Sequence, residues 1–316
     1  PMIALRTALK VPGGLAVGGL AIGLAWAFLF ELVFDRSVRR PVDVGKKLRL
    51  PLFLSIPNLS SKRPRRFMPW RGRGKSGTGP GQDGIVPVTA AESDSIRGNG
   101  ELALLDRDQA LLPFHETLRD RLIGYFESRG LTHKPKLVAV TGINNGTGVT
   151  TTAAGLAKSL SETGDGNVLL VDLAPGQGAA RQFSRGKAVC GFEEMLTMRD
   201  SAQVQDNLYV VANGTGAEGL SRVLSHRFRH LVPKLKASDF DYIIFDLPPV
   251  SQISITPRLA GFMDMVLLVA ESEKDSVELV QHASSMLAES KAQVGVVLNR
   301  TRNYVPASIH QEELAN

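Results

Sequence analysis

Cysteine is almost missing from this sequence, since Cys190 is the only one among 316 residues. One cysteine cannot form a disulfide within the chain, so the disulfide-rich class of small secreted domains is excluded and a reducing compartment is favoured. We expect Cys190 to be a small buried apolar residue rather than a reactive thiol. The six histidines suggest no metal site either. His226 and His230 are four residues apart without acidic or cysteine partners nearby, and we expect them on a helix surface.

A second absence concerns a lysine. Residues 141–151 read TGINNGTGVTT, in which Gly148 and Thr150 keep the spacing of the phosphate-binding pattern G-x-x-x-x-G-K-[ST]. Gly142 lies one residue ahead of the pattern's first glycine, and Val149 stands in the lysine position. In such loops the backbone amides wrap the phosphates, the lysine neutralises them and the following hydroxyl ligates Mg²⁺. Valine can pack but cannot donate a charged hydrogen bond. The candidate phosphate-binding residues are Gly142, Asn144, Asn145, Gly146, Thr147, Gly148, Val149, Thr150 and Thr151.

The flanks of this loop have the composition that a phosphate loop needs. Residues 136–141 form a short apolar run with β-branched side chains, which predicts a buried parallel strand. Residues 151–160 have apolar side chains at helical spacing. Strand, glycine-rich turn and helix follow one another, so the sequence predicts a phosphate loop rather than an ordinary strand-to-helix turn.

Further apolar runs predict an α/β fold. We expect strands at 167–173, 207–213, 241–246, 264–270 and 293–299, and helices that include 217–237 and 274–289. A helix is also expected to start after Pro113 and to reach about Arg129. Strands that alternate with helices indicate a mostly parallel sheet with helices on both faces.

Two aspartates end predicted strands beside the loop. Asp172 ends the run NVLLVD and Asp246 ends DYIIFD, and ligands bind at the carboxyl ends of such strands. Together with Thr150, these carboxylates are the candidate Mg²⁺ ligands and the candidate catalytic acids. The plainer alternative is that each aspartate caps the turn that follows its strand.

The sequence also predicts one membrane span. Residues 11–30 carry no charged side chain and would measure about 30 Å as a helix, which matches the hydrocarbon core of a bilayer. Arg36, Arg39 and Arg40 follow the span, so the residues after about 35 should be cytoplasmic. Small-xxx-small spacing at Gly14 and Gly18 would allow helix association in lipid, although glycine is common in such helices.

Positive charge is concentrated after the span. Between Asp35 and Lys75 there are thirteen basic and two acidic residues, which gives this stretch a charge of 13 − 2 = +11. Because the net charge of the chain is +6, all other residues together carry 6 − 11 = −5. Residues 59–100 are rich in Arg, Lys, Gly, Ser and Pro, and we predict a disordered basic linker. We expect this linker to contact anionic inner-membrane lipid. Binding of nucleic acid is the alternative for a basic segment that contains aromatic residues, and we do not expect it here.

Several motifs resemble a known family. DRSVRRPVDV, VLLVD, FDYIIFDLPPV and VGVVLNR occur in the order and spacing of bacterial chain-length determinants (polysaccharide copolymerases) fused to a bacterial tyrosine kinase (BY-kinase) domain. The resemblance divides the chain into a transmembrane helix (1–34), a juxtamembrane segment (35–58), the basic linker (59–100) and a cytoplasmic P-loop domain (101–316). Because the chain starts at Pro1, we expect an upstream helix and periplasmic domain.

The resemblance implies an inner-membrane protein of exopolysaccharide or capsular polysaccharide biosynthesis. It would self-associate, contact the polysaccharide polymerase and export machinery, and bind ATP or ADP with Mg²⁺, here weakly or not at all. In the family a Glu-x-x-Arg-x-x-Arg helix assembles rings. Glu116 and Arg119 match this motif, but Leu122 does not.

Two further departures concern catalysis. The family's second acidic motif continues with an aspartate and an arginine, where this chain has Ala174 and Gly176. The family's tyrosine-rich tail is reduced to Tyr304, the only candidate phosphoacceptor near the end. The sequence therefore favours a degenerate kinase that acts as an assembly scaffold. An active autophosphorylating kinase is the alternative. A partitioning-type ATPase is disfavoured by the span and by Asn144, which stands where those enzymes have a second lysine.

Overall fold

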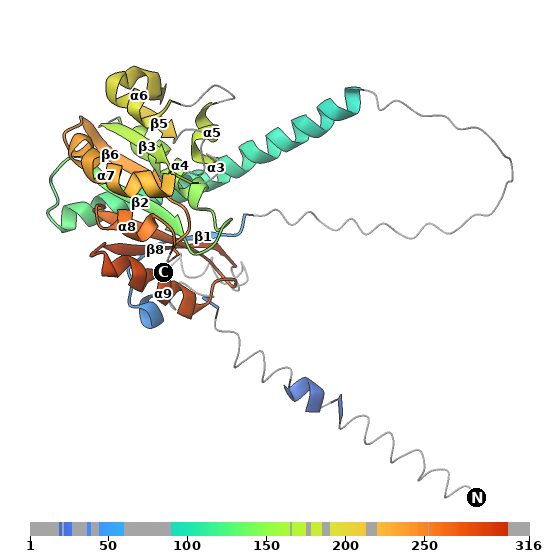
Figure 1. Ribbon diagram of the computed structural model, residues 1–316. Coiled ribbons are helices and arrows are strands. Elements are labelled where there is room, and N and C mark those ends of the chain that lie inside the picture. Colours follow the sequence, from blue (N-terminus) through green and yellow to red (C-terminus); the bar gives the residue numbers. More distant parts are fainter. Residues whose placement is uncertain are drawn as a thin grey trace, which may run out of the picture.

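The computed structural model describes residues 19–20, 22–26, 37–38, 44–59, 90–164, 166–174, 178–184, 190–212, 220–251 and 253–302 (Figure 1). In this part of the chain one sheet has the strand order β1-β8-β7-β2-β6-β3-β5-β4. The strands are β1 (Leu52–Pro57), β2 (Lys136–Gly142), β3 (Asn167–Asp172), β4 (Gln203–Gln205), β5 (Leu208–Ala212), β6 (Phe240–Asp246), β7 (Met265–Glu271) and β8 (Val294–Thr301). All neighbours are parallel except β4, which pairs antiparallel with β5.

Helices cover both faces of this sheet (Figure 1). The α-helices are α3 (Ala90–Ser128), α4 (Val149–Ser161), α5 (Gly178–Ser184), α6 (Phe192–Thr197), α7 (Leu220–Lys236), α8 (Thr256–Ala260) and α9 (Val277–Glu289), with short turns η1 (Val44–Leu48) and η2 (Arg199–Ala202). One core lies between the sheet and α3, α4 and α5, and the other between the sheet and α6 to α9. The predicted fold class is confirmed, and every predicted strand is present within a residue or two.

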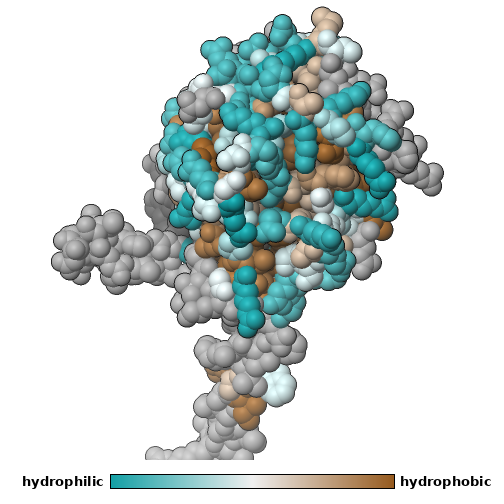
Figure 2. All heavy atoms as spheres, turned by 90° about the vertical axis from the view of Figure 1, so that its left-hand side faces the viewer, coloured by the Kyte–Doolittle hydropathy of each residue, from teal (hydrophilic) through white to brown (hydrophobic). Residues whose placement is uncertain are grey.

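Most large apolar side chains are used in these two cores. Figure 2 shows one face, where hydrophilic side chains cover most of the surface and hydrophobic ones show between them. In the described part of the domain, the large hydrophobic side chains that are strongly exposed are Met198, Val204, Ile253 and Leu279. Cys190 is buried as expected, and His230 is exposed on α7.

The edge strand β1 was not predicted. We assigned its residues to a separate juxtamembrane segment, but β1 pairs in parallel with β8 and belongs to the sheet. The ring of Phe53 lies over Gly295, where an added Cβ would be only 2.3 Å from the ring. Arg121 of α3 donates to the Phe53 carbonyl at 2.6 Å, and Tyr125 packs against the ring with centroids 5.5 Å apart. The sheet therefore includes residues far upstream of the phosphate loop.

The start of α3 differs from the prediction. We expected a helix after Pro113 because proline is favoured in the first turn, yet α3 begins at Ala90 and contains Pro113 in its interior. The predicted start is therefore wrong, and residues 90–100, which we assigned to the disordered linker, are helical. The rest of the helix continues to Ser128, as predicted. The remainder of the predicted linker, residues 60–89, lies outside the described residues.

For the part of the chain that the structure describes, we find no helix with both the length and the apolar character of a membrane span. Most of the predicted span, residues 11–30, lies outside that part. Its described residues, 19–20 and 22–26, are helical. Their large apolar side chains, Leu20, Ile22, Leu24 and Trp26, are each at least 63% exposed.

Phe53→Ala tests whether β1 is structural. We expect it to lower the free energy of unfolding by about 3 kcal/mol, because the substitution leaves a cavity between Gly295 and α3. Chemical denaturation of the purified chain measures this. Leu279→Ala is the control, since this side chain is 47% exposed on α9 and its truncation should cost less than about 0.5 kcal/mol. Equal effects of the two substitutions would show that β1 contributes nothing specific.

Candidate functional site

The predicted phosphate loop lies between β2 and α4, as expected from its flanks. Gly146 and Gly148 have φ values of 81° and 98°, which favour glycine, and Gly148 precedes the first turn of α4. The loop is closed so tightly that a Cβ on Gly142 would lie 2.5 Å from Thr147 Oγ1 and 2.7 Å from Val149 Cγ2. The backbone thus retains the compact turn and the helix N-terminus that bind phosphates in such loops.

Val149 begins α4 and has a packing role. Its side chain is partly buried, lies against the end of β2 at Gly142, and packs on the core formed with α3 and α4. The residue that would supply the positive charge is therefore an apolar contact. Lys136 cannot replace it, because it begins β2 while the loop follows the last residue, a separation of about 20 Å along the strand.

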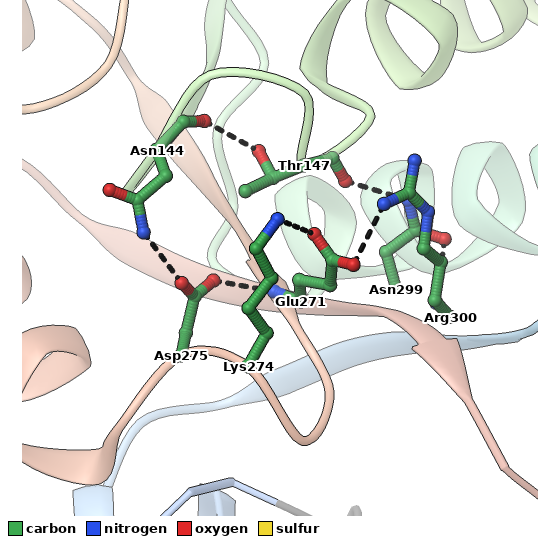
Figure 3. Close-up of polar contacts among 7 residues, drawn as sticks. All are labelled: Asn144, Thr147, Glu271, Lys274, Asp275, Asn299 and Arg300. Carbon is green, nitrogen blue, oxygen red and sulfur yellow. Dashed lines mark hydrogen bonds and ion pairs between the residues drawn. The ribbon is translucent and has the colours of Figure 1, made fainter.

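Two asparagines hold the phosphate loop to the neighbouring part of the sheet (Figure 3). Asn144 Nδ2 donates to Asp275 Oδ1 at 2.8 Å. Asn299 Nδ2, at the end of β8, donates to the Thr147 carbonyl at 2.7 Å. Within the loop, Thr147 Oγ1 donates to the Asn144 carbonyl at 3.2 Å. Sequence reasoning found Asn144 but missed Asp275 and Asn299, which lie more than 120 residues downstream.

The two predicted aspartates lie side by side at the carboxyl edge of the sheet. Asp172 and Asp246 are directly paired residues on the parallel strands β3 and β6, and both are buried. Asp172 accepts hydrogen bonds from the backbone amides of Ala174 and Ala180 at 3.1 Å and 2.8 Å. Asp172 therefore caps the turn that follows β3. Both carboxylate oxygens of Asp246, in contrast, are buried with no hydrogen-bond partner in the described structure.

The electrostatics of the two aspartates differ accordingly. Burial raises the pKa of Asp172, and hydrogen bonds from the amides of Ala180, Ala174 and Ala179 oppose that rise. Burial first, and then the charge of Asp172, raise the pKa of Asp246 to about 7, while the nearby Thr150 side chain opposes this rise. An acid with such a pKa is partly protonated at neutral pH, unless a cation binds beside it.

Asp246, Asp172 and Thr150 fit a magnesium ion that arrives with phosphates. Mg²⁺ is usually held by one or two carboxylates, with waters and substrate phosphates completing its ligands. The unpartnered oxygens of Asp246 provide such a ligand. No group of three or more His, Cys, Asp and Glu side chains within the described ranges could hold a metal by itself.

Two cations that the sequence analysis did not identify lie near the loop. Lys274 and Arg300 both pair with Glu271, at 3.1 Å and 2.7 Å (Figure 3). Burial of Glu271 opposes its ionisation, but the hydrogen bonds from Arg300 and Lys274 outweigh burial and lower its pKa. Glu271 therefore compensates one of the two positive charges that lie near the loop.

The predicted assembly residues lie on α3, away from the phosphate loop. Arg119 pairs with Asp120 at 2.8 Å and donates to the Ser159 carbonyl of α4 at 3.3 Å. Leu122, the third position of the motif, is fully buried. It packs in the core rather than on the surface, so the motif is incomplete in packing as well as in sequence. Tyr304 lies outside the described residues.

Fold and site together define a P-loop α/β protein of the BY-kinase type. Residues 135–311 match the family described as cellulose biosynthesis protein BcsQ. This match covers more than half of the chain, and the chain therefore belongs to that family.

Similar proteins agree with this class. The chain is 27% identical over 177 residues to tyrosine-protein kinase CpsD of Streptococcus pneumoniae, covering 53% of this chain and 77% of that protein. It is 28% identical over 289 residues to the putative tyrosine-protein kinase EpsB of Ralstonia solanacearum, covering 89% of this chain but only 34% of EpsB. The BceF tyrosine kinase domain has the same fold, with a TM-score of 0.57 at 19% identity, covering 84% of this chain and 100% of that one. The predicted resemblance to BY-kinase domains is confirmed.

The raised pKa of Asp246 leads to a pH prediction. Because its folded pKa of about 7 exceeds the unfolded value of about 3.9, its contribution to stability is complete below pH 4 and is lost as pH rises towards 7. The wild-type chain should therefore lose about 2–4 kcal/mol of its free energy of unfolding between pH 4 and pH 8, and Asp246→Asn should not show this loss. Denaturant unfolding without Mg²⁺ measures both. Asp206→Asn, at an exposed position, is the control. Parallel pH profiles for wild type and Asp246→Asn would contradict the assignment.

Proposed function

We propose that this chain is part of an inner-membrane protein of polysaccharide biosynthesis and export, with a kinase-like domain that serves as an assembly scaffold. The family match and the kinase names of the relatives support the polysaccharide and BY-kinase context. The observation that carries the scaffold role is Val149, which packs against Gly142 where a charged side chain would bind phosphate. Chain-length regulation is the specific role we infer from the resemblance of residues 30–57.

Catalysis is expected to fail for an electrostatic reason. A bound nucleotide with Mg²⁺ would supply the transferable phosphoryl group, and such transfer depends almost wholly on positioning and charge stabilisation. This chain's loop can offer backbone amides, Thr150 and the two aspartates. The cations beside the loop, Lys274 and Arg300, both pair with Glu271, and the charge of Arg181 acts on Asp172. Asp172 and Asp246 are on this account vestigial catalytic residues.

The scaffold would be anchored in the membrane. The exposed apolar side chains of residues 20–26 would be covered by lipid if the predicted span is correct, and the basic stretch that follows would lie against anionic headgroups. Residues after about 35 would then be cytoplasmic. Because β1 is built into the sheet, the domain would start only a short distance from the membrane surface. As partners we propose further copies of the same protein, through self-association, and the polymerase and export machinery.

An active tyrosine kinase remains the competing function. The intact loop backbone and the unpartnered oxygens of Asp246 favour it, since they are the parts of the site that nucleotide and Mg²⁺ would use. On this alternative Tyr304 would be the phosphoacceptor. Nucleotide affinity separates the two functions.

Calorimetric titration of Mg-ADP and Mg-ATP into the detergent-solubilised chain makes this test. We expect Val149→Lys to bind about 10- to 100-fold more tightly than wild type, because a charged hydrogen bond to phosphate contributes about 1.5–3 kcal/mol. Val149→Leu is the matched control, since it also enlarges the side chain but adds no charge, and it should bind no better than wild type. Micromolar binding by the wild-type chain would instead support the kinase.

A further inference from the structure

The segment at Ser37 and Val38 lies against the loop that follows β7. Ser37 forms an antiparallel bridge with Ser276. The Val38 amide donates to the Asp275 carbonyl at 3.0 Å, and the Val38 carbonyl accepts from the Glu273 amide at 2.9 Å. The Val38 side chain is fully buried. Residues that follow the predicted membrane span are thus fixed to residues 273–276 by paired backbone hydrogen bonds.

Asp275 connects this segment to the phosphate loop. Its side chain is fully buried. One carboxylate oxygen accepts from Asn144 Nδ2 at 2.8 Å, and the other accepts from the Glu271 amide at 2.7 Å. The carboxylate therefore joins the phosphate loop to the end of β7 (Figure 3), while the main chain of the same residue bonds Val38. Hydrogen bonds to a buried charged acceptor are strong, and leaving one unmade is costly.

A second connection reaches the phosphate loop from the same side. The Ser272 amide donates to the Asn299 carbonyl at 2.9 Å, and Asn299 Nδ2 donates to the Thr147 carbonyl. Residues 271–275 are therefore bonded to both sides of the loop, directly at Asn144 and through Asn299 at Thr147. A shift of residues 271–275 cannot leave the loop unchanged without breaking one of these bonds.

We propose that Asp275 is a positioning residue for the phosphate loop, through which the loop and the segment at Ser37–Val38 are coupled. Movement of the membrane-proximal segment changes the order of the loop, and by thermodynamic reciprocity any occupant of the loop changes the order of that segment. This inference goes beyond the proposed function, since it holds whether or not nucleotide binds. A plainer role for Asp275 is to close the turn after β7, where its amide donates to the Glu271 carbonyl at 3.0 Å.

Amide hydrogen exchange of the full chain in detergent distinguishes the two roles without nucleotide. Val38→Pro removes the donor to Asp275, whereas Val38→Ala shortens the side chain and keeps that donor. Asp275→Asn keeps the shape but replaces one acceptor with a donor. We expect Val38→Pro and Asp275→Asn to raise exchange of the peptide spanning residues 142–152 by about tenfold, and Val38→Ala to raise it much less.

Val44→Ala is the control for general destabilisation, because this buried valine of η1 packs beside α9 and has no bond to residues 271–276. It should leave residues 142–152 at the wild-type rate. Reciprocity adds that Asn144→Ala should raise exchange of the peptide that contains Val38. The coupling is refuted if Val38→Pro and Asp275→Asn affect only residues 271–276, or if Val44→Ala accelerates the phosphate loop equally. Should Val38→Pro fail to fold, Asp275→Asn and Asn144→Ala carry the test.

Discussion

The alignment of three parallel strands is the constraint on which the site depends. Because β2, β3 and β6 run in the same direction, the phosphate loop, Asp172 and Asp246 meet at one edge of the sheet. The same alignment that would serve a magnesium nucleotide brings two buried carboxylates together, and among the described residues Asp246 has no hydrogen-bond donor. A loop lysine would lie close to that edge and offset the negative charge. With Val149 in its place, the edge keeps its geometry without the charge of a loop lysine.

The structure also includes residues upstream of the predicted P-loop domain in the same sheet and core. β1 lies more than 75 residues upstream of the phosphate loop, yet its Phe53 ring fills the space above Gly295 and packs against Tyr125 of α3. Val38 and Val44 are buried in the opposite core. The described residues that follow the predicted span, 37–38 and 44–59, are thus part of the packed unit. A scaffold built in this way would connect its membrane-proximal residues to the sheet through hydrogen bonds and apolar contacts, with little free chain between.

Sequence patterns predicted the centre of this fold because parallel strands are buried on both faces and read as continuous apolar runs. Asp172, Asp246 and the glycine loop followed from the same reading, since their roles depend on strand ends and local spacing. β1 was missed because a short strand beside a predicted membrane segment has no distinguishing period, and its partner β8 is about 240 residues away. Asp275 and Asn299 were missed for a related reason. Their hydrogen bonds to the loop join residues far apart in the chain, and such bonds produce no pattern in the sequence around either residue.

Phosphate transfer by the wild-type chain tests the central claim, that an intact fold has lost the charge its chemistry needs. The purified full chain would be incubated with Mg²⁺ and ATP labelled at the γ-phosphate, and label on tyrosine would be measured. The account predicts no incorporation above that of the heat-denatured chain. Time-dependent labelling of Tyr304 that Asp246→Asn abolishes would contradict it, and would show that the loop backbone and the two aspartates suffice without the lysine.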